Sequence, residues 1–349
     1  IPACVVPLND FCLNTGRLIA EHYNLLYLDK QSIEMARNKF LAKDLYKQAG
    51  LNVAKTIIHR AGDDVNVSIK PLLFPVVVKP LNLGGSGGVK KANSFDEVKA
   101  SITEAQTHLE KFAKTYDASE HQFVIEEYIE KKDEFSVEVI CTPSEIHILC
   151  VTQKILSREP YFGEIGHVTP ACVPVKISKK IKDIAKRACQ ALGLTRGLAH
   201  VEIIQSTNDE LHIVELGSRP GGDGIIDLVE ATYSFCPYKL HIESFLGQSI
   251  EFKSKTNDSN AIFYITFENQ YRIKEIASQL DAPYLKDKAE IRAISTSLKA
   301  GDIVSRMENW STRYGFIRYK YLDKKLTIKD KIELHKELLD ELVKVEPYE

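Results

Sequence analysis

A strand-like apolar run that leads into a glycine-rich stretch constrains the fold of this chain more than any other feature. Val76, Val77 and Val78 lead directly to Lys79, and the stretch that follows contains Gly84, Gly85, Ser86, Gly87 and Gly88. Glycines lack a Cβ atom, so several backbone N–H groups can turn toward one anion, and a lysine at a strand end can neutralise another oxygen. The stretch predicts a phosphate-binding loop, with a flexible hairpin and a solvent-facing Lys79 as the alternative.

The order of residues in this stretch differs from two common nucleotide motifs. The lysine precedes the glycines, whereas it follows them in G-x-x-x-x-G-K-[ST], and no helix is predicted to begin at the last glycine. A second lysine, Lys39, lies in a pattern that predicts one helix from Ser32 to Gly50. Lys39 is an ordinary solvated side chain unless Lys79 binds phosphate, in which case the two cations can flank one polyphosphate.

Two acids lie in strand patterns that are joined by a short turn. Glu202 is within the predicted strand 200–205 and Glu215 within 211–216, and pairing of these strands can place both carboxylates on one face. Buried like charges are costly unless a cation is present, and magnesium takes carboxylates together with phosphate oxygens. The pair predicts a magnesium site, with two edge-exposed acids as the alternative.

Arg219 follows Glu215 in a turn that contains Gly217, Gly221, Gly222 and Gly224. An arginine at this place is expected to hold a developing oxyanion beside the metal. A third acidic cluster contains Glu126, Glu127, Ile129 and Glu134. Its extended backbone can offer N–H and C=O groups to an adenine edge and its last carboxylate can accept ribose hydroxyls, with a solvated acidic loop as the alternative.

The composition is that of a globular chain of two to three domains. The 349 residues are 44% hydrophobic and 27% charged with a net charge of −2, which gives no sign of a nucleic-acid binder. No apolar run approaches the roughly 20 residues that span a bilayer. Seven scattered cysteines without a C-x-x-C pair favour thiols in a reducing compartment, so we expect a cytoplasmic protein.

Taken in chain order, these elements resemble the ATP-grasp superfamily from about Gln31 to Gly247. The resemblance implies an α+β fold in which two α+β lobes clamp ATP. It implies that Lys39 and Lys79 hold phosphates, that Gly84–Gly88 is a mobile loop, and that Glu202 and Glu215 bind Mg²⁺, for which Mn²⁺ can substitute. By the same resemblance, Glu126, Glu127 and Ile129 contact adenine and Glu134 contacts the ribose. Many family members have Asn where this chain has Gly217, which implies either weaker metal binding or an ion that relies on the two acids and ATP alone.

Within the superfamily, the sequence is most similar to bacilysin-type L-amino-acid ligases and carnosine-synthase-like enzymes. The runs Glu215–Asp223 and Gly163–Ala171 carry this similarity. It implies that Glu164 and His167 contact the substrate in a catalytic site with Arg219, although a loop histidine is the plainer interpretation of His167. Residues 1–30 are expected to be the remnant of a truncated N-terminal domain. An ATP-grasp domain over 31–250, with a small lid lobe at about 53–125, and a β-rich C-terminal cap over 251–349 are expected to follow.

The expected function is an ATP-dependent carboxylate–amine ligase. It would form an amide through an acyl phosphate and release ADP and phosphate. The expected partners are a small carboxylate and an amine, amino acids in particular, with no nucleic acid and no membrane, and a homodimer is left open. Two alternatives stay open: a carboxylase-type enzyme that acts on bicarbonate or formate, and a non-catalytic ATP-binding module.

Overall fold

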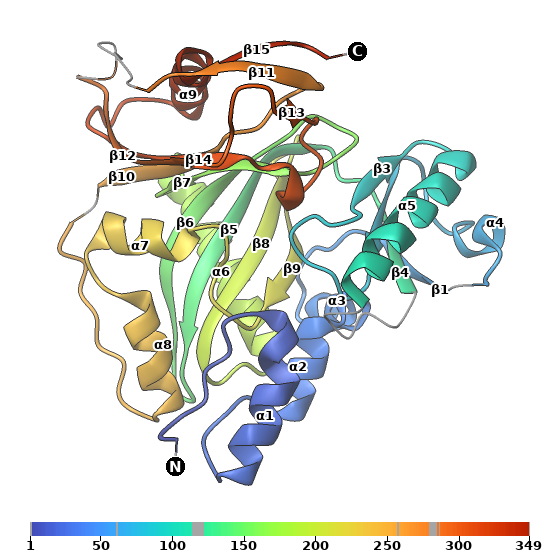
Figure 1. The fold of residues 1–349 in the computed structure, drawn as a ribbon. Helices are drawn as coiled ribbons and strands as arrows, with labels where there is room; N and C mark the ends of the chain where they lie inside the picture. The colour runs from blue at the N-terminus through green and yellow to red at the C-terminus, as the bar shows by residue number, and fades with distance from the viewer. Residues whose placement is uncertain are drawn as a thin grey trace.

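The computed structural model describes residues 2–60, 62–113, 122–256, 258–278, 285 and 287–348. Within these residues the named strands form three antiparallel sheets, against which helices pack (Figure 1). No helix in the described ranges is both long and apolar enough to cross a membrane.

The largest sheet has the strand order β12-β14-β10-β7-β6-β5-β8-β9. Its strands are β5 (Lys131–Cys141), β6 (Ile146–Leu156), β7 (Glu164–Thr169), β8 (Gly197–Ser206), β9 (Leu211–Gly217), β10 (Ser259–Tyr264), β12 (Ala289–Thr296) and β14 (Gly315–Tyr321). Because side chains alternate along a strand, β5 places Phe135 and Val137 in the apolar core beneath α6 (Val175–Ala191). Glu134, Ser136 and Glu138 point to the opposite face, which is polar.

A smaller sheet has the strand order β1-β4-β2-β3. Its strands are β1 (Thr56–Arg60), β2 (Val76–Pro80), β3 (Lys90–Ala92) and β4 (Gln122–Glu127), with helices α4 (Val65–Ser68) and α5 (Phe95–Ala113) against them. Val76 and Val78 pack into the core shared with α5. The alternation directs Val77 and Lys79 to the other face, toward the largest sheet.

The helix predicted from Ser32 to Gly50 is wrong as a single element, because the chain breaks at Asn38. The elements before the small sheet are η1 (Asp10–Cys12), α1 (Leu13–His22), α2 (Lys30–Arg37) and α3 (Lys39–Gln48). Asn38 is extended, and its side-chain oxygen accepts hydrogen bonds from the N–H groups of Phe40 and Leu41, which starts a new helix. Asp29 rather than Ser32 caps α2, while the left-handed exit at Gly50 is confirmed. Lys39 is therefore the first residue of α3.

The C-terminal third joins the largest sheet and also builds a sheet of its own. Its strand β10 pairs with β7, so β10, β12 and β14 extend the sheet that carries the polar face. Above them lie β11 (Tyr271–Ile276), β13 (Ile303–Val304), β15 (Val343–Pro347) and α9 (Ile328–Leu342) (Figure 1). The remaining elements are α7 (Ile225–Tyr233), α8 (Pro237–Phe245) and η3 (Trp310–Thr312). Antiparallel sheets with segregated helices confirm the predicted α+β class.

Candidate active site

A cavity of about 880 Å³ lies between the small sheet and the polar face of the largest sheet. Its lining includes Lys39, Lys79, the start of the glycine-rich stretch, Glu126, Glu127, Ile129, Glu134, Glu164, Glu202 and Glu215. Most of the predicted site residues therefore share one cleft, although they come from elements far apart in the sequence.

Lys79 is not solvent-facing, because its ammonium group lies 3.0 Å from Oε2 of Glu126 and its side chain is only 13% exposed. Lys43, one turn after Lys39 on α3, lies 2.7 Å from Oε1 of the same carboxylate. Burial opposes the charge on Glu126, but the two lysines outweigh it and lower the pKa of Glu126 to about 2. Burial lowers the pKa of Lys43 to about 8, although Glu126 opposes this shift. The Glu126 carboxylate thus fixes two cations at one wall of the cavity.

Glu202 and Glu215 lie directly opposite each other in the β8–β9 pair, although the register next to the short turn would pair Glu202 with Val214. The register shifts between Glu202 and Ile203, which leaves Val214 as an extra residue in β9. As a result, the consecutive residues Val214 and Glu215 both line the cavity. The side chain of Glu202 is 15% exposed and that of Glu215 is 29% exposed, so neither is a simple solvated edge acid.

Lys154 is a central residue that the sequence analysis missed. Its ammonium group lies 2.7 Å from Glu202, 2.8 Å from Glu164 and 3.1 Å from Glu134, and its side chain is 3% exposed. Burial alone would lower the pKa of Lys154, but the three carboxylates raise it well above its usual range. A signal was present, since this lysine lies in one strand between the apolar run Ile148–Val151 and the apolar pair Ile155 and Leu156. A buried cation among three acids is costly in isolation and is held by the whole set.

The oxygens of Glu202 and Glu215 fit a magnesium ion. Lys154 and His200 both bond to Oε1 of Glu202, and no described residue bonds to its Oε2. Glu215 has one described partner, Lys39, which lies 3.4 Å from its Oε2. Magnesium prefers a few carboxylate oxygens completed by phosphate and water, which is the donor set that this pair presents.

The glycine-rich stretch divides into a part that faces the cavity and a part that packs. Gly84, Gly85 and Ser86 line the cavity, and Ser86 donates a hydrogen bond of 2.9 Å to the carbonyl of Phe162. Gly85 has a φ of +65°, and a Cβ atom there would lie 2.9 Å from the Trp310 ring. Gly87 packs on Leu83 and Gly88 packs on Ala105 of α5, so a side chain at either position would disturb the packing of the turn.

Arg219 faces a second cavity of about 1290 Å³ that shares Lys39, Gly84, Gly85 and Glu215 with the first. Its Nε donates to Oδ2 of Asp10 at 2.8 Å and its Nη1 donates to the carbonyl of Pro220 at 2.9 Å. No described residue bonds to its Nη2. A Cβ atom at Gly217 would lie 3.4 Å from both Arg219 and Asp10, so the ion pair occupies the space next to this glycine.

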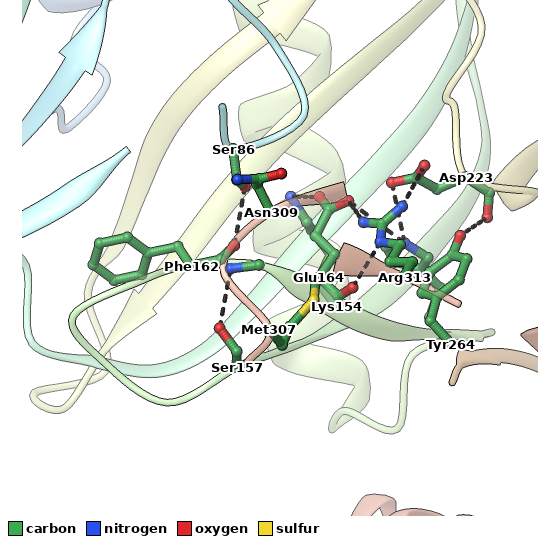
Figure 2. Close-up of polar contacts among 12 residues, drawn as sticks. Ser86, Lys154, Ser157, Phe162, Glu164, Asp223, Tyr264, Met307, Asn309 and Arg313 are labelled. Carbon is green, nitrogen blue, oxygen red and sulfur yellow. Dashed lines mark hydrogen bonds and ion pairs between the residues drawn. The ribbon is translucent and has the colours of Figure 1, made fainter. Parts of the chain in front are cut away.

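Glu164, Arg313 and Asp223 form an ionic cluster (Figure 2). His167 lies next to this cluster. Arg313 lies between two acids, with Nη2 2.9 Å from Glu164 and Nη1 2.8 Å from Asp223. Burial, with Lys154 opposing, raises the pKa of Glu164. His167 is fully buried, and its Nε2 lies 3.9 Å from Oε2 of Glu164 and 3.9 Å from Oδ2 of Asp223. It is outside the lining of either described cavity. Glu164 therefore faces the cavity, and His167 lies behind it.

The expected adenine and ribose residues all line the first cavity. The carboxylate of Glu126 is taken up by lysines, while Glu127 accepts a hydrogen bond of 3.0 Å from the N–H of Leu73. Ile129 contributes to the lining, and Glu134 lies 3.5 Å from Lys131 as well as next to Lys154. All three carboxylates of this cluster thus have partners within the protein, and that of Glu126 is held by two lysines.

Comparison with known proteins identifies related sequences. Residues 72–227 match the model of the ATP-grasp domain. The alanine–anticapsin ligase of Bacillus subtilis is 24% identical over 218 residues, an alignment that covers 58% of this chain and 45% of that enzyme. The chain thus spans about half the length of this curated relative.

Solved structures show the same architecture. An L-amino acid ligase from Bacillus licheniformis superposes with a TM-score of 0.76 at 22% identity, over 99% of this chain and 81% of that chain. The biotin carboxylase domain of the Hydrogenobacter thermophilus 2-oxoglutarate carboxylase, solved with MgADP and bicarbonate, superposes with a TM-score of 0.67 at 14% identity, over 96% and 73% of the two chains. A ligase and a carboxylase share this fold, so the fold alone leaves the reaction open.

Proposed function

We propose that the protein is an ATP-dependent carboxylate–amine ligase, because residues 72–227 match the model of the ATP-grasp domain and the chain has the ATP-grasp fold. One observation carries the proposal. A cationic wall with Lys79 and an acidic wall with Glu202 and Glu215 enclose one cavity, and this cavity continues into a second one that contains Arg219.

ATP would occupy the first cavity. Lys39 and Lys79 would hold its phosphates, with Gly84, Gly85 and Ser86 above them. Lys154 would add a third cation from strand β6 of the largest sheet. Ile129 and Glu127 would contact the adenine, and Glu134 would contact the ribose. The ring of Trp310 lies against Gly85, and this contact would hold the glycine-rich stretch closed over the triphosphate. The closed stretch would exclude water.

Glu202 and Glu215 would hold magnesium, or manganese in its place. When bound, the ion would neutralise charge on the phosphates during transfer. The oxygen of Glu202 that Lys154 and His200 leave unbonded is the one offered to the ion. Gly217 provides no side-chain ligand, so this chain would bind the metal through the two acids and the nucleotide.

The acid substrate would bind in the second cavity with its carboxylate at Nη2 of Arg219. A carboxylate oxygen would attack the γ-phosphorus, the bond between that phosphorus and the β–γ bridging oxygen would break, and ADP would leave. The amine would then attack the acyl carbon, phosphate would leave with the C–O bond electrons, and the nitrogen would lose a proton. Arg219 would stabilise the negative charge that develops on the acyl oxygen.

Glu164 would contact the amine, because it faces the cavity and burial favours its protonation more than that of an ordinary carboxyl. His167, which lines neither cavity, would act on the substrate only through its neighbour Glu164. In domain terms, we propose an ATP-grasp domain over 31–250 with a lid lobe at about 53–125, and a cap over 251–349. The cap would complete the site, since Trp310 and Arg313 reach it.

A phosphate-release screen tests the proposal. The whole protein, with ATP and magnesium, is incubated with pairs of amino acids, with single amino acids, and with bicarbonate or formate. The proposal expects phosphate release that requires an amino-acid pair, together with an amide product by mass spectrometry. Release that bicarbonate alone stimulates would favour a carboxylase, and tight ATP binding without release across the whole panel would favour a non-catalytic module.

A further inference from the structure

A fully buried carboxylate, Glu138 of β5, has no part in the reaction proposed above. Its exposed fraction is 0%, and burying an ionised carboxyl without partners is strongly unfavourable. Its Oε1 lies 2.5 Å from Nδ1 of His200, and its Oε2 accepts a hydrogen bond of 3.1 Å from the N–H of Gly221. One carboxylate thus connects strand β8 with the turn that carries Arg219.

His200 continues this connection to the acidic wall. Its second nitrogen, Nε2, lies 3.3 Å from Oε1 of Glu202. Residues 200 and 202 point to the same face of β8, and Glu138 lies directly opposite His200 in the β5–β8 pair. The imidazole is therefore held between two carboxylates, one committed to the protein and one that lines the cavity.

The turn approaches Glu138 in a way that only glycine permits. A Cβ atom at Gly221 would lie 2.8 Å from both carboxylate oxygens of Glu138 and 2.9 Å from its Cδ. Glu138 cannot easily move away, because its other partner is the buried ring of His200. The glycine at 221 thus has a specific packing role beside any contribution to the flexibility of the turn.

We propose that Glu138 and His200 are positioning residues. They fix the side chain of Glu202 so that its Oε2 faces the metal, and they hold the turn that contains Arg219 at a fixed distance from Glu202. The proposal rests on the proposed magnesium site and extends it. His200 and Lys154 occupy the same oxygen of Glu202 from two sides, which leaves the other oxygen for the ion. Residues that orient metal ligands in this way typically change metal affinity by 10- to 100-fold when they are replaced.

The test measures binding of the β,γ-imido analogue of ATP to the whole protein by calorimetry, with magnesium and with EDTA. For His200→Phe we expect the magnesium-dependent gain in affinity to fall by about tenfold or more, while affinity in EDTA changes less than about twofold. Gly221→Ala, which displaces Glu138 without removing a charge, should reduce the same gain. His200→Gln, which keeps one hydrogen-bonding group, should restore part of it.

The matched control is His241→Phe. His241 is also buried, but its ring bonds to the N–H of Leu198 and the carbonyl of Pro7. This control should lower the melting temperature without changing the magnesium dependence. The proposal is overturned if His200→Phe leaves the magnesium-dependent gain in affinity unchanged. If His200→Phe does not fold, the proposal is overturned when both His200→Gln and Gly221→Ala leave that gain unchanged. No amino acid is present in this assay, so a failure of the ligase reaction would be seen separately in the phosphate-release screen.

Discussion

Replacing Lys154 with methionine should destabilise the protein strongly, because it leaves three carboxylates without their shared cation. The ammonium group lies within 3.1 Å of oxygens from Glu134, Glu164 and Glu202, and the side chain is nearly inaccessible. Removing one partner of a buried ion pair costs about 3 to 5 kcal/mol. With an unfolding entropy of roughly 2.1 cal/mol/K per residue over the 349 residues, this cost lowers the melting temperature by about 4 to 7 °C.

The measurement is thermal unfolding of the whole protein, followed by circular dichroism with and without magnesium. Added magnesium should recover part of the loss in Lys154→Met, because a divalent cation can neutralise the acids that the ammonium group has left. Lys132→Met is the control, since Lys132 and Asp209 form an exposed pair whose side chains are 53% and 60% accessible. An exposed pair of this kind contributes little to stability, because solvent screens the two charges. Equal melting temperatures for the two variants would refute the reasoning.

Three further predictions follow from the two cavities. Arg219→Ala should leave binding of the imido analogue nearly unchanged but lower amino-acid-dependent phosphate release by about 100-fold, as expected for a group that acts in the transition state; equal losses in both assays would contradict this role. Glu126→Gln removes a carboxylate whose pKa is about 2 against 4.5 in an unfolded chain. Its stabilisation is present above pH 4.5 and is lost as the pH falls toward 2, so the advantage of the wild type in urea unfolding should shrink by about 3 kcal/mol over that interval. Gly85→Ala, at a positive φ and against the Trp310 ring, should slow phosphate release and also lower the melting temperature modestly because of backbone strain; a wild-type rate would exclude closure by this contact.

The parts of the site that could be predicted from the sequence are those in which the relevant residues are close along the chain. The valine run that ends at Lys79, the glycine-rich stretch, and the two strands around a short turn with Glu202 and Glu215 all have local signals. The short turn predicts that β8 and β9 pair, but the bulge at Val214, which brings Glu215 opposite Glu202, has no signal in the turn itself.

The parts that could not be predicted depend on contacts between distant strands. The order β6-β5-β8 places Lys154 and Glu138 beside Glu202, and nothing in the local pattern of β6 or β5 specifies that neighbour. The break at Asn38 was missed because the apolar spacing continues across it, although Asn is a favoured N-cap residue. The pairing of Asp10 with Arg219 spans most of the chain and has no sequence signal at all.

The measurement that tests the central claim most directly is calorimetric binding of the imido analogue of ATP, with saturating magnesium, to the wild type, Lys79→Ala and Glu215→Gln. If the lysine wall and the acid wall hold one nucleotide, the wild type binds one equivalent. Lys79→Ala should weaken binding both with and without magnesium, whereas Glu215→Gln should weaken it only with magnesium. Undiminished binding in both variants would show that the nucleotide does not lie between these walls, and the account would be wrong.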